Sequence, residues 1–93
     1  MNKEKYYICQ VASKNYAIQV MYILENLGYT KFKLISTPLQ IRKGCNYSIK
    51  FKEIEDLKII IKETNKLNIE IKEVYSIEQI NDKRIIKKLE YSI

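Results

Sequence analysis

The apolar residues of this chain follow two spacings in turn, and the order in which these spacings alternate limits the folds available to it. Alternation at every second residue predicts strands, and apolar residues at i, i+3 and i+4 predict helices. The predicted strands are 5–11, 30–36, 47–52 and 69–75, and the predicted helices are 14–27 and 53–67. The order βαββαβ predicts an α+β ferredoxin-like fold, a four-stranded antiparallel sheet with both helices on one face.

Residues that typically cap helices support these boundaries. Ser13 is a good N-cap for the first helix, and Gly28 provides the left-handed position that ends many helices. Beyond the sixth element, Ser76 begins a sequence typical of a helix start, and isoleucines recur through residues 77–93. We therefore expect a ferredoxin-like domain over 1–76 and a C-terminal helical extension of the same domain over 77–93, which would cover a sheet edge or mediate dimerisation.

Composition limits the classes of protein to which the chain can belong. With 93 residues, 46% of them hydrophobic, it has room for one domain with a modest core. The longest apolar run, Ile59 to Ile61, is far shorter than a membrane span, and the charged start at residues 1–5 does not resemble a signal peptide. These features favour a cytoplasmic protein without a membrane partner. A net charge of +6 is compatible with an anionic partner.

Several kinds of chemistry are excluded by the residues that are missing. The chain has no histidine and only two cysteines, Cys9 and Cys45. Histidine-based catalytic triads, zinc sites of the Cys/His type and four-cysteine metal sites are therefore excluded within one chain. No glycine-rich phosphate loop and no acid–base pair at catalytic spacing stand out. We expect no cofactor, no metal and no independent enzymatic activity.

The long irregular segment from Thr37 to Cys45 is the part of the sequence that folding alone does not explain. Loops of this length within small domains are often functional. Cys45 is the candidate reactive thiol because Arg42 and Lys43 place positive charge near it, which favours the thiolate. Without a histidine base, such a thiol suits thiol exchange, persulfide carriage or oxidation better than hydrolysis.

Supporting roles in this segment fall to Gly44, which permits an unusual backbone angle, and to Pro38, which cannot donate to a strand ladder. A half-buried packing role for Cys45 stays open. Cys9, in the middle of a strand, is expected in the core. A Cys9–Cys45 disulfide is conceivable if the first and third strands are neighbours.

A set of local sequences resembles the selenium/sulfur carrier-like family of small bacterial proteins. The likeness covers about residues 5–76. It runs through the first strand and Ser13, Leu27-Gly28, Leu34 to Pro38, Gly44-Cys45, Ile49 to Phe51 and Tyr75. The resemblance implies that Pro38 shapes the loop, that Cys45 is the carrier thiol and that the partners are sulfur- or selenium-donor and acceptor proteins. Asn46 departs from the glycine expected after the cysteine.

Two other functions fit the predicted topology. A basic nucleic-acid-binding module of RNA-recognition type would use Tyr6 and Tyr7 on the first strand and the segment Lys43 to Lys50 on the third. That segment lacks aromatic residues at two positions where the pattern requires them, Cys45 and Lys50. A non-catalytic, dimeric interaction or regulatory domain is the other alternative, although the turn at 10–15 has no glycine for ligand contact.

Overall fold

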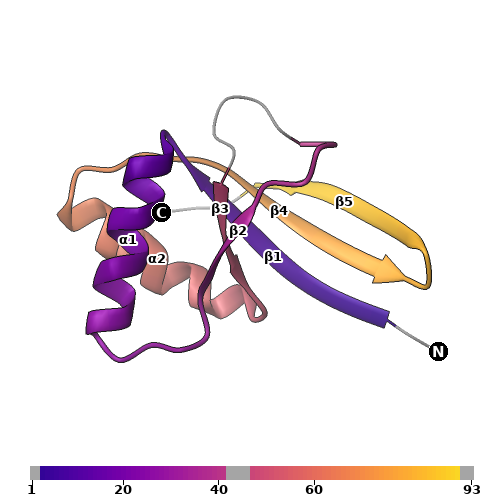
Figure 1. Ribbon diagram of the computed structural model, residues 1–93, viewed down its shortest axis with the longest axis horizontal. Helices are drawn as coiled ribbons and strands as arrows, with labels where there is room; N and C mark the ends of the chain where they lie inside the picture. Colours follow the sequence, from indigo (N-terminus) through magenta and orange to yellow (C-terminus); the bar gives the residue numbers. More distant parts are fainter. Residues whose placement is uncertain (1–2, 42–46, 91–93) are drawn as a thin grey trace.

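The computed structural model describes residues 3–41 and 47–90, which form a five-stranded antiparallel sheet with two α-helices (Figure 1). The strand order is β2-β3-β1-β4-β5, so that β2 and β5 are the edge strands. The elements are β1 Lys3–Val11, α1 Lys14–Asn26, β2 Lys33–Ser36, β3 Tyr47–Phe51, the 3₁₀ turn η1 Ile54–Asp56, α2 Leu57–Lys66, β4 Ile71–Ile80 and β5 Lys83–Leu89.

The prediction of a four-stranded ferredoxin-like fold with a helix over 77–93 is wrong. β4 continues to Ile80, and β5 then pairs antiparallel with it from Ile80–Lys83 to Val74–Leu89. The two strands are joined by a two-residue turn in which Asn81 has φ 56°, a left-handed angle that asparagine tolerates. The β-branched isoleucines that suggested a helical face instead fill a fifth strand.

The ends of α1 confirm two predictions. The Ser13 hydroxyl accepts a hydrogen bond from the Tyr16 amide at 3.2 Å, so Ser13 is the N-cap. Gly28 follows the helix with φ +94°, the left-handed conformation that favours glycine. Among the described residues, no helix has the length and hydrophobicity needed to cross a membrane.

The main core lies between the helices and one face of the sheet. Cys9, Ile49 and Phe51 point to this face, where they pack with side chains from both helices. The buried hydrophobic residues of the helices are Ala17, Val20, Met21 and Leu24 of α1 and Leu57 and Ile60 of α2. Because these positions follow the helical spacing seen in the sequence, the amphipathic faces pack as expected.

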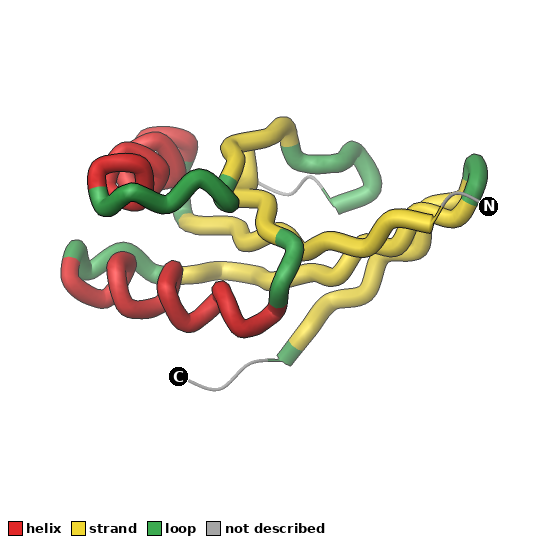
Figure 2. The backbone as a smooth tube through the Cα atoms, turned by 90° about the horizontal axis from the view of Figure 1, so that it is seen from below, coloured by secondary structure: helices red, strands yellow, loops and turns green. Residues whose placement is uncertain are grey.

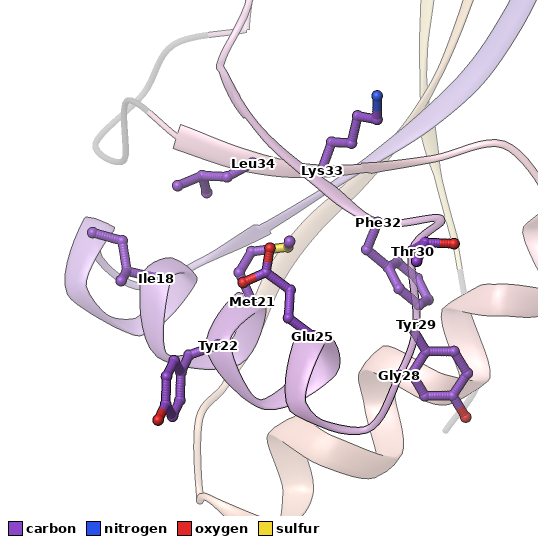
Figure 3. A pocket seen from close by; sticks show the side chains of 10 residues that line it. All are labelled: Ile18, Met21, Tyr22, Glu25, Gly28, Tyr29, Thr30, Phe32, Lys33 and Leu34. Carbon is purple, nitrogen blue, oxygen red and sulfur yellow. The ribbon is translucent and has the colours of Figure 1, made fainter.

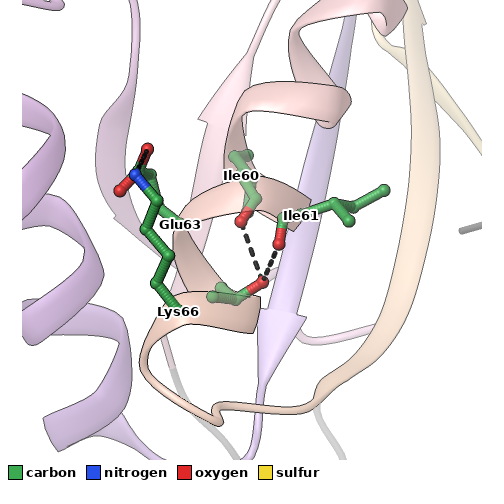
Figure 4. A network of polar contacts seen from close by, with 5 residues as sticks. Ile60, Ile61, Glu63 and Lys66 are labelled. Atoms are coloured by element: carbon green, nitrogen blue, oxygen red, sulfur yellow. Dashed lines mark hydrogen bonds and ion pairs between the residues drawn. The ribbon is translucent and has the colours of Figure 1, made fainter.

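Polar groups on α2 are satisfied locally. The buried Thr64 hydroxyl donates to the carbonyl oxygens of Ile60 at 2.8 Å and Ile61 at 3.0 Å, while Lys66 Nζ lies 3.5 Å from the Glu63 carboxylate (Figure 4). A threonine hydroxyl that bonds back to its own helix can be buried without losing its hydrogen bonds. Thr64 therefore sits in the interface between α2 and the core without leaving an unpaired donor.

The opposite sheet face carries a second, smaller core. Tyr6, Ile8, Ile41 and Ile77 are buried together there, with Ile35, Tyr75 and Ile86 packed around them. Figure 2 shows the helices gathered at one end of the molecule while the strands extend beyond them at the other. The molecule is accordingly elongated, 39 × 27 × 23 Å.

Candidate functional site

Of the two cysteines, Cys9 lies within the described residues and Cys45 lies outside them. Cys9 is a free thiol with 0% exposure, and its strand neighbours are Ile49 and Val74. Burial without a charge partner raises the pKa of the Cys9 thiol to about 12. Its predicted place in the core is confirmed, and a Cys9–Cys45 disulfide is not formed. At neutral pH Cys9 is protonated and inaccessible, so it cannot act as a nucleophile.

The predicted site falls on the connection between β2 and β3. Cys45, Arg42, Lys43 and Gly44 lie outside the described residues, so their assignment remains a prediction. Pro38 is described and is buried, and its carbonyl oxygen accepts a hydrogen bond from the Ile41 amide at 3.0 Å. The first part of the connection is therefore a tight turn that begins at the proline.

Ile41 anchors this turn to the sheet. Its side chain is only 4% exposed and packs on Tyr6, Ile8 and Ile77, on the face that the helices leave open. Leu39, two residues earlier, points to solvent with 76% exposure. Residues 37–41 thus fold back over the sheet and cover part of its second face. Ile41 was not singled out from the sequence, because one isoleucine between polar residues shows no apolar period.

A pair of hydroxyl groups links the two ends of the connection. Thr37, just after β2, and Ser48, in β3, are both buried, and their side-chain oxygens are 2.6 Å apart. Because the pair joins residues on either side of the segment, it fixes the distance between the point where the connection leaves the sheet and the point where it returns. Thr37 begins the irregular segment singled out from the sequence, but neither residue was predicted to have a role in the site.

Removing both hydroxyls of this pair is expected to cost less than the sum of the two single removals. Thr37→Val or Ser48→Ala leaves a buried hydroxyl without its partner, so we expect each to lower the free energy of unfolding by about 1–3 kcal/mol. The double variant leaves no orphaned group, and we expect it to be less destabilised than the sum of the single variants. Urea denaturation of the wild type, the two single variants and the double variant measures the coupling between the two hydroxyls. If the losses of the single variants simply add up in the double variant, the expected coupling is contradicted.

A third buried polar residue belongs to the same face. Gln10 is 4% exposed, and its Nε2 has no hydrogen-bond partner among the described residues. Continuing the β1–β3 register places Gln10 opposite Ser48, so it extends the Thr37–Ser48 pair across the sheet. The base of the connection is thus polar, whereas the neighbouring positions Ile8 and Ile41 are apolar.

The predicted aromatic platform does not form an open surface. Tyr7 points to the helix side and stacks on Phe51 with ring centroids 5.7 Å apart. Tyr6 lies on the other face but is 6% exposed, within the cluster that contains Ile41, and Lys50 Nζ is 4.3 Å from its ring centroid. RNA-recognition domains stack bases on exposed rings of this strand. The described residues give the nucleic-acid interpretation no support.

Two hollows lie elsewhere on the surface. The first, of about 690 Å³, lies between α1 and β2, with Met21, Tyr22 and Phe32 in its walls (Figure 3). The second, of about 520 Å³, is lined by lysines and acids together, and the bond from Lys31 to Asp56 at 2.9 Å raises the pKa of Lys31. Neither hollow is lined by a thiol. Within the described ranges no group of three His, Cys, Asp or Glu residues could hold a metal ion.

Comparison with models of known protein families identifies the family to which this chain belongs. A family model described as "Putative Se/S carrier protein-like" matches residues 6–76, from β1 into β4. The chain belongs to this family. No curated protein and no solved structure gives a significant match. The Se/S carrier-like match ends within β4, so the last residues of β4 and all of β5 lie outside it.

Proposed function

We propose that this member of the Se/S carrier-like family carries a sulfur or selenium atom on Cys45 and presents it to partner enzymes. The observation that carries the proposal is the burial of Cys9: the chain has only two cysteines, and one of them is sealed in the core with a thiol pKa of about 12. Any carrier chemistry that uses a cysteine therefore falls on Cys45.

The chemistry is the transfer of one sulfur atom from a donor persulfide to the Cys45 thiolate. The Cys45 thiolate attacks the outer sulfur of a donor persulfide, R–S–SH; a new S–S bond forms at Cys45, the donor S–S bond breaks and R–S⁻ leaves. Passing the atom on repeats the exchange with an acceptor thiolate, and a selenium atom is exchanged in the same way. No oxidant is needed, because the sulfane sulfur keeps its oxidation state throughout.

The sequence around Cys45 supplies what such an exchange needs. Arg42 and Lys43 are close in sequence and favour the thiolate, and Gly44 adjoins the cysteine. Pro38, Ile41 and the Thr37–Ser48 pair hold the start and the base of the connection against the sheet. We infer a non-catalytic carrier that works with donor and acceptor proteins in a reducing cytoplasm, where the thiol stays free.

The test is persulfide loading followed by mass spectrometry. Reduced protein is treated with inorganic polysulfide, and the gain of one sulfur atom is assigned to a peptide. We expect the wild type and Cys9→Ala to load on the Cys45 peptide and Cys45→Ser not to load, with its thermal unfolding midpoint unchanged. Loading of Cys45→Ser, or a failure of folded wild type to load, would contradict the proposal.

A further inference from the structure

β5 offers a free sheet edge that the family match does not include. It is the last strand in the order β2-β3-β1-β4-β5 and pairs on one side with β4. The other side of an edge strand presents a row of backbone N–H and C=O groups without ladder partners. Figure 1 shows the β4–β5 hairpin projecting away from the helices, so neither helix covers this edge. Within residues 3–41 and 47–90 no strand pairs with this side of β5, which leaves it open to another extended chain.

The side chains of β5 give this edge a strong positive charge. Four of its seven residues are basic, Lys83, Arg84, Lys87 and Lys88, and none is acidic. Lys88 Nζ lies 3.3 Å from the Glu73 carboxylate, whereas Glu78, the acid within the stretch of β4 that pairs with β5, forms an ion pair with Lys3 at 3.6 Å. Across residues 3–41 and 47–90, no ion pair is formed by the other three basic residues of β5.

The charges are distributed over both faces of the strand. Because side chains alternate, Lys83 and Lys87 point to one face with Ile85 between them, and Arg84 and Lys88 point to the other. Ile85 is 42% exposed, so an apolar side chain is accessible between the two lysines. An added strand would meet basic groups on both of its faces and an apolar group at the centre of one.

We propose that β5 binds an extended, acidic segment of a partner protein, which adds to the sheet as a sixth strand. Backbone hydrogen bonds supply the pairing, and carboxylates opposite Lys83, Arg84 and Lys87 supply the selectivity. A second copy of this chain is the wrong occupant, because pairing β5 with itself sets cations opposite cations. The same lysines thus prevent self-association through this edge and select an acidic partner. This inference does not depend on Cys45.

The test uses a synthetic peptide of about eight residues with glutamates on both strand faces and a valine near its centre, long enough to span β5 at ~3.3 Å per residue. We expect binding to slow hydrogen exchange at alternate amides within 83–89, because outward N–H groups become bonded. Lys83→Glu/Arg84→Glu/Lys87→Glu is expected to weaken binding at least about tenfold. The matched control, Lys52→Glu/Lys58→Glu/Lys62→Glu, makes the same change in net charge on exposed residues away from β5 and is expected to bind like the wild type.

Further peptides separate strand addition from general attraction between charges. A peptide of the same charge with prolines at alternate positions cannot pair, and we expect it not to protect the β5 amides. The proposal is overturned if this peptide or a single-stranded oligonucleotide binds as tightly as the first peptide, because binding is then electrostatic alone. It is overturned equally if the first peptide does not bind, or if both triple variants lose binding to the same extent.

Discussion

Phe51→Ala is expected to lower the free energy of unfolding by about 3–5 kcal/mol, the largest effect of any single substitution proposed for this chain. Phe51 is 1% exposed and lies where β3 meets the helices. Its ring stacks on Tyr7 at 5.7 Å and contacts Phe32 at 6.3 Å between centroids. Truncation to alanine removes these contacts and leaves a cavity that a small core has little means to fill.

Urea denaturation at neutral pH measures this loss. Tyr22→Ala is the matched control, because Tyr22 is 66% exposed and its loss should change stability by no more than about 0.5 kcal/mol. A loss below about 1 kcal/mol for Phe51→Ala would show that the ring does not form the centre of the core described above.

The second large effect is a loss of stability at alkaline pH caused by Cys9. Its thiol pKa is about 12 in the folded protein against 9.0 for an unperturbed cysteine. Below pH 9 the thiol is neutral in both states; above pH 9 the unfolded chain releases the proton, which favours unfolding until the pH reaches about 12. The expected loss from this residue is about 3 kcal/mol between pH 8 and pH 11.

Comparison with Cys9→Ala isolates this contribution. Lys31 and Tyr75 also have raised pKa values and add to the alkaline loss, but they are present in both proteins. We therefore expect the stability difference between wild type and Cys9→Ala to shift by about 3 kcal/mol in favour of the variant from pH 8 to pH 11. A difference that stays constant over this range would mean that Cys9 ionises as readily in the folded protein as in the unfolded chain.

The elements with a clear apolar period were predictable from the sequence. Ser13 and Gly28 bound α1 as expected, and the alternation of Tyr47, Ile49 and Phe51 identified β3. In each case one physical signal, an N-cap, a left-handed glycine or period-two burial, indicated the element without competition from another.

The C-terminal region was not predictable in the same way. Ile85 and Ile86 are adjacent, so neither a period of two nor a helical period is clear, and the cap-like sequence at Ser76 favoured a helix. Ser76 instead lies within β4, because pairing with β1 continues through this stretch to Ile80–Lys3. The signal for a hairpin was an asparagine between two isoleucine-rich runs, and Asn81 adopts the left-handed angle that the turn requires.

The candidate site was predictable only in part. Its expected location in the β2–β3 connection rests on Pro38 and on the length of the irregular segment. The contacts that hold its base, from Ile41 to the open sheet face and from Thr37 to Ser48, depend on which strands are neighbours. Isolated serine, threonine and isoleucine residues carry no such information in the sequence.

The most direct test of the account is the rate of iodoacetamide labelling of the native protein against pH, with the Cys9 and Cys45 peptides resolved by mass spectrometry. We expect Cys45 to label rapidly with an apparent pKa below the ordinary ~8.5, and Cys9 to label only after denaturation. Rapid labelling of Cys9, or labelling of Cys45 only in denaturant, would contradict the assignment of Cys45 as the carrier thiol.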